Sequence, residues 1–532
     1  MSKKIIAYDL GTGGNKASLY EGDGTCLASS FVPYETFYPN AGWHEQRPMD
    51  WWRAVVESTR KLLAEKKADL ADIECLSISG HSLGVVPLGR DGGLLRETAP
   101  IWSDTRSEKQ ANAFFAKVGE KEWYMTTGNG FPPPCYSVFK VMWYRDNQPD
   151  IFRKIHRILG TKDYVNYRMT GRLLTDFSYA SGSGAYDLKK WDFSPKFFEA
   201  AGIPRELFPE IVPSTHVVGE LTKEAAGELG LPPKVKVICG GVDNSCMALG
   251  ARNIAEGRVY TSLGSSSWIA VSSGEPVLDF KTRPFVFTHV VPKMFTSAVS
   301  IFAAGSSLAW VKDTLCRDLG IGPHGGDPWS GAAAARAQMG AGGGAGGTDA
   351  WALVNERAAR SPVGAKKLLF NPSLAGGSSQ ETTPHIRGAF SGIDLGHTQE
   401  DVIRSCMEGV AMNLSLALDV LKRLGGLSGE MVMVGGGSKS GLWRRIFADT
   451  YEMAIVKTNV GQDAGSLGAA AVGAVGAGLW RDFSRIDEVH KVEEVVRPIP
   501  GNVEKYRKLR PVFEYLRASQ ARIGEMLHGI DL

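Results

Sequence analysis

Short apolar runs alternate along the chain with longer stretches whose apolar residues recur at helical spacing. The short runs include residues 73–79, 235–239 and 430–434, whereas residues 53–66 show the helical spacing. Short runs bounded by turn residues predict strands, and apolar residues at every third or fourth position predict an amphipathic helix. Such alternation is typical of α/β proteins with parallel or mixed sheets. The pattern therefore predicts an α/β fold.

Two segments far apart in the chain share a pattern of strand, glycine turn and strand. They are residues 5–20 and 259–271, and each is followed by turn residues, which is typical of a β-hairpin. A hairpin that recurs halfway along a chain of 532 residues predicts two related halves facing each other across a cleft. We expect an N-terminal domain over residues 1–252 and a C-terminal domain over 253–532, closed by a helix over 502–527.

The composition narrows the class of protein. Apolar residues make up 43% and charged residues 22% of the chain, as in ordinary soluble globular proteins. Sixty Lys and Arg against 57 Asp and Glu leave a formal charge of +3, whereas binders of nucleic acids or membrane surfaces carry a strongly basic face.

The apolar start reaches Asp9 too soon for a signal peptide, and no apolar run approaches the ~20 residues of a membrane span. The seven cysteines contain no C-x-x-C pair, which favours reduced thiols in a cytoplasmic protein over disulfides or a zinc site.

The first of three glycine-rich motifs reads Asp-Leu-Gly-Thr-Gly-Gly-Asn-Lys over residues 9–16. The carboxylate of Asp9, at the end of a predicted strand, suits Mg²⁺, which prefers oxygen ligands and keeps several waters. Glycines let backbone amides approach phosphate oxygens, and Thr12 and Lys16 add side-chain donors. The alternative is a hairpin whose glycines serve only the geometry of the turn.

The second motif, Gly-Gly-Val-Asp-Asn-Ser over residues 240–245, follows an apolar strand and precedes a predicted helix rich in small residues. Asp243 is therefore expected at a helix N-terminus near the carboxyl end of a strand, where α/β proteins place their ligands. The alternative is that Asp243 is a helix N-cap, for which Asp and Asn are preferred. The two roles are compatible, since a reactive carboxylate can also cap a helix.

The third motif, Gly435, Gly436 and Gly437 followed by Ser438, lies between a predicted strand and a predicted helix. A nucleotide can lie over such a turn. The motif lacks the spacing of a P-loop and of the G-x-G-x-x-G fingerprint, which argues against a nicotinamide-dependent dehydrogenase. The alternative is a tight connection between strand and helix.

Polar and aromatic residues that suit a sugar follow the N-terminal strands. His81 comes directly after a predicted strand, and Trp102 and Asp104 precede a predicted helix. Sugars are held by hydrogen bonds to side chains and by aromatic faces against their C–H groups. The alternatives are a structural role for His81 and a solvated position for Arg106 in the first turns of its helix.

The order of these motifs carries more information than each motif alone. The chain reads D-x-G-T-x-x-x-K, W-x-E-Q, I-W-x-D-x-R, G-G-x-D-N, S-L-G-x-S and G-G-G-x-x-S-x-x-W-R, in that order. In the order of these motifs, the chain resembles the FGGY family of carbohydrate kinases from about Lys4 to about Trp480. Within that family it resembles the xylulokinases most closely. Two further tracts, over residues 162–176 and 431–468, carry the same resemblance.

The resemblance implies two actin-like domains of the ribonuclease H type around a catalytic cleft, with ATP and Mg²⁺ as cofactors. It implies that Asp243 is the general base and that Asp9 works with the metal. The other implied positions are Thr12, Lys16, Gly264 and Ser265 near the phosphates, Gly435, Gly436, Gly437, Ser438, Asp463 and Ala464 on the adenosine side, and His81, Trp102, Asp104 and Asn244 near the sugar.

Three departures from the family pattern bear on the acceptor. Residues 80–82 read Gly-His-Ser where bacterial xylulokinases often carry Met-His-Gly, and residues 380–385 lack the family's arginine near Thr382. Residues 340–347 are a glycine-rich insertion or an altered loop, expected to be flexible. A ketopentose, with D-xylulose first, is the expected substrate, and another ketose, a polyol or a sugar acid is the alternative. An actin-like nucleotide-dependent binding protein is the alternative outside enzymes. The closing helix packs either internally or against a second copy, so a homodimer is compatible with the sequence.

Overall fold

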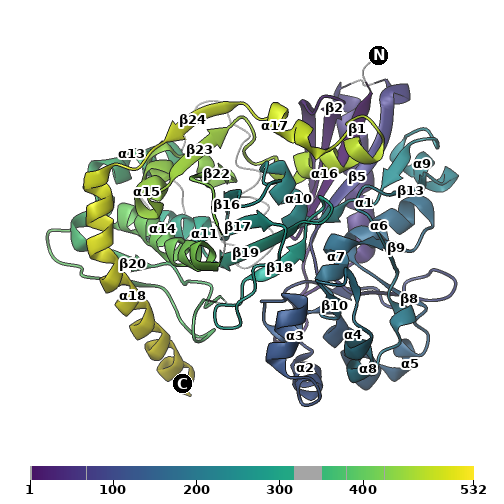
Figure 1. The fold of residues 1–532 in the computed structure, drawn as a ribbon, viewed down its shortest axis with the longest axis horizontal. Helices are drawn as coiled ribbons and strands as arrows, with labels where there is room; N and C mark the ends of the chain where they lie inside the picture. Colours follow the sequence, from purple (N-terminus) through teal and green to yellow (C-terminus); the bar gives the residue numbers. More distant parts are fainter. Residues whose placement is uncertain (1–2, 67–68, 317–349, 379, 425, 532) are drawn as a thin grey trace.

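The chain folds around two mixed sheets, each flanked by helices (Figure 1). The structure is a computed structural model that describes residues 3–66, 69–316, 350–378, 380–424 and 426–531. Each sheet has seven strands in this described part, and the predicted α/β class is confirmed. The glycine-rich stretch at 340–347, expected to be a flexible loop, lies outside the described residues.

The first sheet is formed by the N-terminal half in the order β13-β14-β5-β1-β2-β3, with β15 beside β5. Its strands are β1 (Lys4–Gly11), β2 (Gly14–Glu21), β3 (Cys26–Pro33), β5 (Ile73–Gly80), β13 (Val217–Glu220), β14 (Lys236–Ile238) and β15 (Gly241–Val242). β1 and β2 form the predicted hairpin, and β5, at the predicted strand 73–79, runs parallel to β1, β14 and β15. The carboxyl ends of these parallel strands therefore share one edge of the sheet.

The second sheet repeats this arrangement in the C-terminal half, in the order β18-β19-β17-β16-β22-β23-β24. Its strands are β16 (Val259–Leu263), β17 (Ser267–Ser273), β18 (Phe285–Thr288), β19 (Phe295–Ile301), β22 (Glu430–Val434), β23 (Ala454–Thr458) and β24 (Val492–Val496). β16 and β17 form the second predicted hairpin, and β22, at the predicted strand 430–434, runs parallel to β16. The recurrence of hairpin plus parallel strand confirms that the halves are related in topology.

Helices cover both sheets (Figure 1). In the N-terminal half they are α1 (Pro48–Lys66), α2 (Glu108–Phe115), α3 (Glu120–Thr127), α4 (Ser137–Asn147), α5 (Pro149–Phe152), α6 (Thr161–Thr170), α7 (Phe177–Ser181), α8 (Pro195–Ala201), α9 (Lys223–Leu229) and α10 (Asp243–Gly250). In the C-terminal half they are α11 (Gly305–Leu315), α13 (Ala350–Arg360), α14 (Gln399–Leu424), α15 (Gly441–Tyr451), α16 (Ala464–Gly476), α17 (Ile486–Val489) and α18 (Pro500–His528). α1 and α18 contain the two helices predicted at 53–66 and 502–527. None of the helices in the described ranges is both long and apolar enough to cross a membrane.

Short strand pairs connect these elements. They are β4 (Glu45–Gln46) with β7 (Ala99–Pro100), β6 (Val86–Leu88) with β8 (Arg157–Leu159), β9 (Leu174–Asp176) with β12 (Glu210–Val212), β10 (Tyr186–Asp187) with β11 (Asp192–Phe193), and β20 (Leu369–Asn371) with β21 (Ala389–Ser391). β4 contains Glu45 and β9 ends at Asp176, and both carboxylates form buried ion pairs.

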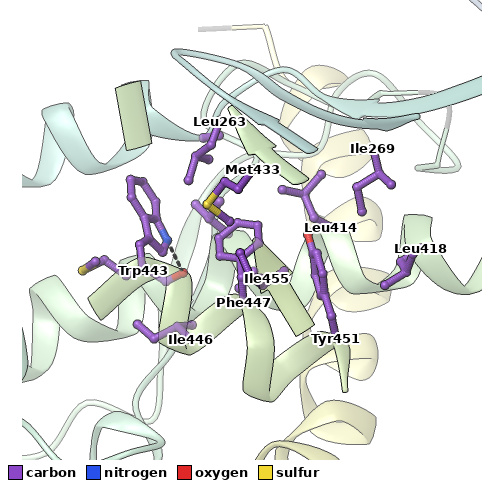
Figure 2. Packing of buried hydrophobic residues seen from close by; sticks show 14 of the residues in the cluster. Leu263, Ile269, Leu414, Leu418, Met433, Trp443, Ile446, Phe447, Tyr451 and Ile455 are labelled. Atoms are coloured by element: carbon purple, nitrogen blue, oxygen red, sulfur yellow. Dashed lines mark hydrogen bonds between the residues drawn. The ribbon is translucent and has the colours of Figure 1, made fainter. Parts of the chain in front are cut away.

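The core of the C-terminal half forms where α14 and α15 cover the second sheet (Figure 2). Leu414 of α14 and Phe447 of α15 pack with Met433 of β22 and are completely buried. The indole of Trp443 fills the same layer and donates a hydrogen bond to the carbonyl of Met407 at 3.1 Å, so its polar atom is satisfied. Burial of apolar surface is the main favourable contribution to folding. This packing therefore fixes the sheet that carries the glycine turn after β22.

α16 joins the two halves. It comes late in the chain, but it packs against β1 and β5 of the first sheet and against α10. A Cβ atom on Gly468 would lie 1.8 Å from the carbonyl oxygen of Cys246 in α10, so the helices touch backbone to backbone. The N-terminal end of α16 is thereby fixed beside the first sheet. The domain division at residues 252 and 253 stays a prediction.

Candidate active site

The register of the first sheet brings Asp9 and Asp243 to the same edge. Asp9 on β1 pairs with Ser79 on β5, and Gly241 on β15 pairs with the same Ser79 from the other side. Asp243 begins α10 two residues after Gly241. Because β1, β5 and β15 are parallel, both carboxylates lie at the carboxyl ends of neighbouring strands, where the glycine motifs led us to expect a ligand site.

Asp243 is the first residue of α10, and the N-cap position is occupied by Val242. The alternative interpretation of Asp243 as an N-cap is therefore wrong. Its carboxylate accepts hydrogen bonds from the backbone N–H of Asn244 at 2.8 Å and from the side-chain amide of Asn244 at 3.1 Å. Burial and the like charge of Asp9 raise the pKa of Asp243 to about 7, although the bonds from Asn244 oppose the shift. A carboxylate with this pKa can take up a proton at neutral pH.

Asp9 lies on the first strand of the hairpin, next to the start of α16. Its carboxylate accepts a hydrogen bond from the hydroxyl of Ser79 at 3.0 Å, and Lys16 pairs with it across the hairpin register. Burial raises the pKa of Asp9, and the positive charge of Lys16 acts against this. A Cβ atom on Gly465 would lie 2.8 Å from Asp9 Oδ2, so the first turn of α16 reaches the carboxylate only because it carries a glycine. The ammonium of Lys16 also forms an ion pair with Asp463, directly before α16.

Thr12 connects the phosphate hairpin to the residues expected around the sugar. The indole N–H of Trp102 donates to the hydroxyl of Thr12 at 2.9 Å, and the side-chain amide of Gln46 donates to its carbonyl at 2.7 Å. The structure thus brings Thr12 and Trp102 together, although the family resemblance implied different ligands for them.

The second hairpin presents Gly264 and Ser265 at its exposed turn. The carbonyl of Gly264 accepts from the N–H of Gly305 at 2.9 Å, and that of Ser265 accepts from the N–H of Ala304 at 2.8 Å. A Cβ on Gly305 would lie 2.4 Å from the carbonyl oxygen of Gly264, so α11 begins in direct contact with the turn. These contacts fix the turn and leave its side chains exposed.

The glycine turn after β22 has a structural reason of its own. Gly435 has a φ of +88°, and a Cβ there would lie 2.6 Å from the carbonyl oxygen of Leu263. A Cβ on Gly437 would lie 2.4 Å from the Leu263 side chain, and the hydroxyl of Ser438 donates to the Gly435 carbonyl at 2.7 Å. The alternative of a tight strand–helix connection therefore accounts for Gly435 and Gly437, while it leaves Gly436 free for a ligand.

This turn lies beside the loop that leads into α16. The N–H of Gly435 donates to the carbonyl of Gly461 at 3.2 Å, and a Cβ on Gly436 would lie 3.1 Å from the side-chain amide of Gln462. Asp463 is the N-cap of α16, and Ala464 is its buried first residue. The third motif and residues 461–464 therefore lie side by side, and their role in binding adenosine stays a prediction.

His81 is buried, with 1% of its surface exposed, and neither ring nitrogen has a hydrogen-bond partner among the described residues. Its ring packs edge-on against Trp51, with 5.6 Å between ring centroids. Burial lowers the pKa of His81 to about 3, so the imidazole is neutral at physiological pH. A neutral imidazole offers one donor and one acceptor, and leaving both unpaired in a protein interior costs free energy that a polar ligand can recover.

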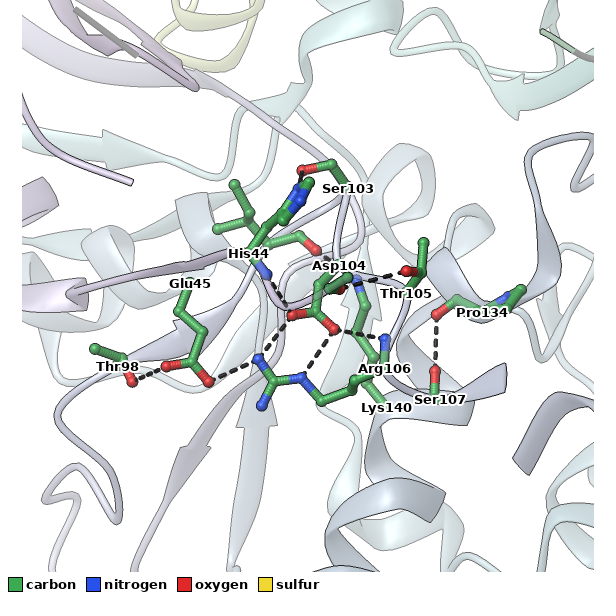
Figure 3. A network of polar contacts seen from close by, with 12 residues as sticks. His44, Glu45, Thr98, Ser103, Asp104, Thr105, Arg106, Ser107, Pro134 and Lys140 are labelled. Atoms are coloured by element: carbon green, nitrogen blue, oxygen red, sulfur yellow. Dashed lines mark hydrogen bonds and ion pairs between the residues drawn. The ribbon is translucent and has the colours of Figure 1, made fainter. Parts of the chain in front are cut away.

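Asp104 is tied into a network with Glu45 and Arg106 (Figure 3). Arg106 Nη2 lies 2.7 Å from Asp104 Oδ2 and 2.6 Å from Glu45 Oε1, and its guanidinium stacks 3.9 Å from the ring centre of Trp43. Asp104 also accepts from the backbone N–H of His44 at 2.7 Å, and it has no exposed surface. The alternative of a solvated Arg106 is wrong, since its side chain is completely buried. The network fixes the loop that carries Trp102.

Ser79 and Gly465 lie beside the carboxylate of Asp9, and the sequence predicted neither contact. In the sequence Ser79 marks only the end of a strand, and Gly465 is only one position in a family tract. No signal in a single sequence states that β5 separates β1 from β15, since that order is a property of the sheet. Among the described residues there is no cluster of three or more His, Cys, Asp or Glu side chains that could hold a metal ion by themselves.

Comparison with known proteins identifies the family. The family models of the FGGY carbohydrate kinases match the chain, the N-terminal domain over residues 4–250 and the C-terminal domain over 259–477. The chain is 29% identical to the xylulose kinase of Bacillus subtilis, with 96% of each chain covered, and 25% identical to the gluconokinase of the same species, with 96% and 95% covered.

The fold agrees as well. The solved structure of ligand-bound xylulose kinase from Lactobacillus acidophilus superposes with a TM-score of 0.85 at 24% identity, over 98% of each chain. This confirms the expected two-domain actin-like fold. Because carbohydrate kinase models match both halves, the prediction of an enzyme is favoured over the alternative of a nucleotide-dependent binding protein. The chain belongs to the FGGY family of carbohydrate kinases and is an ATP-dependent carbohydrate kinase.

Proposed function

We propose that this kinase transfers the γ-phosphate of Mg·ATP to a hydroxyl of a ketopentose, with D-xylulose as the first candidate, and that Asp243 is the general base. The observation that carries the proposal is the placement of Asp243 at the sheet edge that also holds Asp9, with a pKa raised to about 7. A base with this pKa accepts the proton of the sugar hydroxyl as its oxygen attacks the phosphorus. The proton passes to Asp243, and the bond between the γ-phosphorus and the bridging oxygen of ADP breaks.

Asp9 suits the metal that accompanies ATP. Mg²⁺ is typically bound through one or two carboxylates, waters and the phosphates of the substrate, and it needs no larger cluster of protein ligands. The half-buried carboxylate of Asp9, with Ser79 and Lys16 as neighbours, fits this donor set. When bound, Mg²⁺ neutralises charge on the phosphates.

The other predicted residues divide between the two substrates. Thr12 on the first hairpin, and Gly264 and Ser265 on the second, lie at the turns where phosphates are expected, and Lys16 lies on β2 close to the first turn. The surface of the glycine turn and the start of α16 would receive the adenosine, with Gly435, Gly436, Gly437, Ser438, Asp463 and Ala464.

On the sugar side, His81 offers an unpaired donor and acceptor, and Trp102, which donates to Thr12, would lie between the sugar and the phosphates. Asn244 and Asp104 are the remaining predicted contacts, and Asp104 also holds Arg106. The xylulose kinase relative at 29% identity supports a ketopentose, and the gluconokinase relative at 25% identity supports a sugar acid as the second candidate.

The test is coupled ADP release over a panel of pentuloses, hexuloses, polyols and aldonates, measured for the native chain and for Asp243→Asn. We expect the fastest turnover on one ketopentose and a loss of about 10²- to 10⁴-fold in the variant, which is the usual contribution of a general base. Fastest turnover on an aldonate would replace the ketopentose with a sugar acid and keep the mechanism. Turnover that persists in Asp243→Asn would overturn the role of Asp243.

A further inference from the structure

A completely buried group of three charged side chains lies beside the segment that leads to Asp243. Lys162 of α6 forms ion pairs with its neighbour Asp163, at 2.5 Å, and with Asp176 at the end of β9, at 3.0 Å. Burial alone would lower the pKa of Lys162, but the two carboxylates raise it well above its usual value, so the ammonium stays charged. Burying three charges is expensive, and an apolar cluster of similar volume often stabilises a fold at least as well. The cluster therefore calls for an explanation other than stability.

One explanation is a chain of contacts from Asp176 to the residue before Asp243. Asp176 accepts hydrogen bonds from the hydroxyl of Ser178 and, at 2.7 Å, from the hydroxyl of Ser214. The oxygen of Ser178 in turn accepts from the backbone N–H of Val242 at 2.9 Å. Since Ser178 donates to a charged carboxylate, its lone pairs are directed to the Val242 N–H. Val242 is the N-cap of α10, and Asp243 follows it directly.

The same cluster holds the other end of this short segment. The carbonyl of Cys239 accepts from Lys162 Nζ at 3.3 Å and from the side-chain amide of Asn166 at 2.8 Å. The N–H of Gly240 donates to the carbonyl of Ser214 at 3.0 Å. Residues 239–242 are thus held by α6, by the start of α7 and by the chain after β12.

The fit around Ser178 is close. A Cβ on Gly241 would lie 3.1 Å from the Ser178 oxygen, so a larger residue would press against this hydroxyl. β15 itself has only two residues paired with β5, which gives Asp243 little support from the sheet alone. The contact between Ser178 and Val242 therefore supplements the packing of α10 against α16 in holding α10's first residue.

We propose that Ser178, oriented by Asp176 and Lys162, is a positioning residue that sets the place of the Asp243 carboxylate. The inference rests on the proposed function of Asp243 as the general base. Ser178 touches neither sugar nor nucleotide in this scheme, and it acts through the backbone of Val242. A general base that moves by about 1 Å loses its hydrogen-bond geometry with the sugar hydroxyl, which can cost about 10²-fold in rate.

The test compares Ser178→Ala with a matched control on the other side of the same cluster. Thr175 donates its hydroxyl to Asp163 Oδ2 at 2.7 Å and is buried, so it contacts the carboxylate of Asp163 whereas Ser178 contacts that of Asp176. Both Ser178→Ala and Thr175→Ala therefore remove one hydroxyl from a buried carboxylate, and we expect similar decreases in Tm. We expect kcat to fall by about 10- to 100-fold in Ser178→Ala only, with the KM for ATP unchanged.

A third variant keeps the test decisive if Ser178→Ala folds poorly. Ser214→Ala removes one donor to Asp176 and retains Ser178, so we expect a kcat between those of the control and of Ser178→Ala. Native kcat in Ser178→Ala and Ser214→Ala, or an equal loss of kcat in Thr175→Ala, overturns the positioning role. Asp243→Asn separates failure of the positioning role of Ser178 from failure of the proposed function. If Asp243→Asn retains turnover, Asp243 is not the general base, whatever the kcat values of the serine variants.

Discussion

Asp243 lies at the same edge of the first sheet as Asp9, and burial together with the like charge of Asp9 raises the pKa of Asp243 to about 7. One strand, β5, separates the two strands that lead to these residues. The sheet order therefore places a candidate metal ligand beside a candidate base, and it adjusts the proton affinity of the base at the same time. This relationship has consequences both for the pH dependence of the reaction and for stability.

The pH dependence of kcat/KM is expected to show an acidic limb with an apparent pKa of about 7. The base works only when Asp243 is deprotonated, so kcat/KM falls tenfold for each pH unit below that value. His81 does not contribute to this limb, because burial lowers its pKa to about 3. The measurement is sugar-dependent ADP release across the neutral range, with the coupling enzymes assayed separately on added ADP. An acidic limb at the ordinary pKa of a carboxyl group would contradict the buried environment of Asp243.

Asp243→Asn is expected to make the folded protein more stable at alkaline pH. The pKa of Asp243 is raised in the folded state from an ordinary value of 3.8, so folding favours the protonated form. The destabilisation is absent below the unfolded-state pKa, grows as the pH rises and is complete above about pH 7. The amide cannot ionise, so we expect the variant to have the higher Tm at about pH 8 and a similar Tm at about pH 4. Thermal unfolding at both values measures this, and a lower Tm for the variant at the alkaline pH would show that the folded state stabilises the charged carboxylate rather than penalising it.

His81→Phe is expected to separate sugar binding from stability. The phenyl ring keeps an edge contact with Trp51 but removes two buried nitrogens that have no partner among the described residues. We expect an unchanged or raised Tm without substrates, because unpaired buried polar atoms cost free energy. We expect the KM for the sugar to rise by about fivefold or more, and the KM for ATP to stay constant, since one lost hydrogen bond is worth about 1 kcal/mol. A lowered Tm with an unchanged KM would instead favour the structural role for His81.

Local patterns in the sequence predict a large part of the fold. The hairpins at 5–20 and 259–271 and the strands at 73–79 and 430–434 are predictable because each is coded by a continuous run of residues. The closing helix at 502–527 is predictable for the same reason. Periodicity alone does not encode which strands become neighbours, so the adjacency of β1, β5 and β15 had to come from the structure.

The candidate site shows the same limit. Motifs and a family resemblance identify Asp9, Lys16 and Asp243, and the structure brings Asp9, Lys16 and Asp463 together. The burial of Arg106 is not predictable in this way, because a charged residue near a helix start is normally solvated, and its partner Glu45 lies far away in sequence. Whether such a charged side chain is buried depends on contacts between segments that are distant in sequence.

Gly468→Ala tests whether α16 has to touch α10 for the site to assemble. A Cβ at Gly468 would lie 1.8 Å from the carbonyl oxygen of Cys246, a backbone atom that cannot move aside without shifting α10. We expect a loss of about 1–3 kcal/mol in the free energy of unfolding, as is usual for overpacking. We also expect a lower kcat, because α10 begins with Asp243 and the first turn of α16 lies against Asp9.

The matched control is Gly227→Ala in α9, a helical glycine whose added Cβ would meet no heavy atom within 4 Å. Alanine there restricts the unfolded chain more than glycine does, so the control should gain about 0.4–1 kcal/mol and keep native kcat. Thermal unfolding and steady-state kinetics of the two variants give both readouts. If Gly468→Ala lowers Tm but leaves kcat native, the contact between α10 and α16 serves stability alone. If both fall together while Gly227→Ala stays native in kcat, the position of Asp243 depends on a helix that the chain adds more than two hundred residues later, and the two halves of the protein share one catalytic geometry.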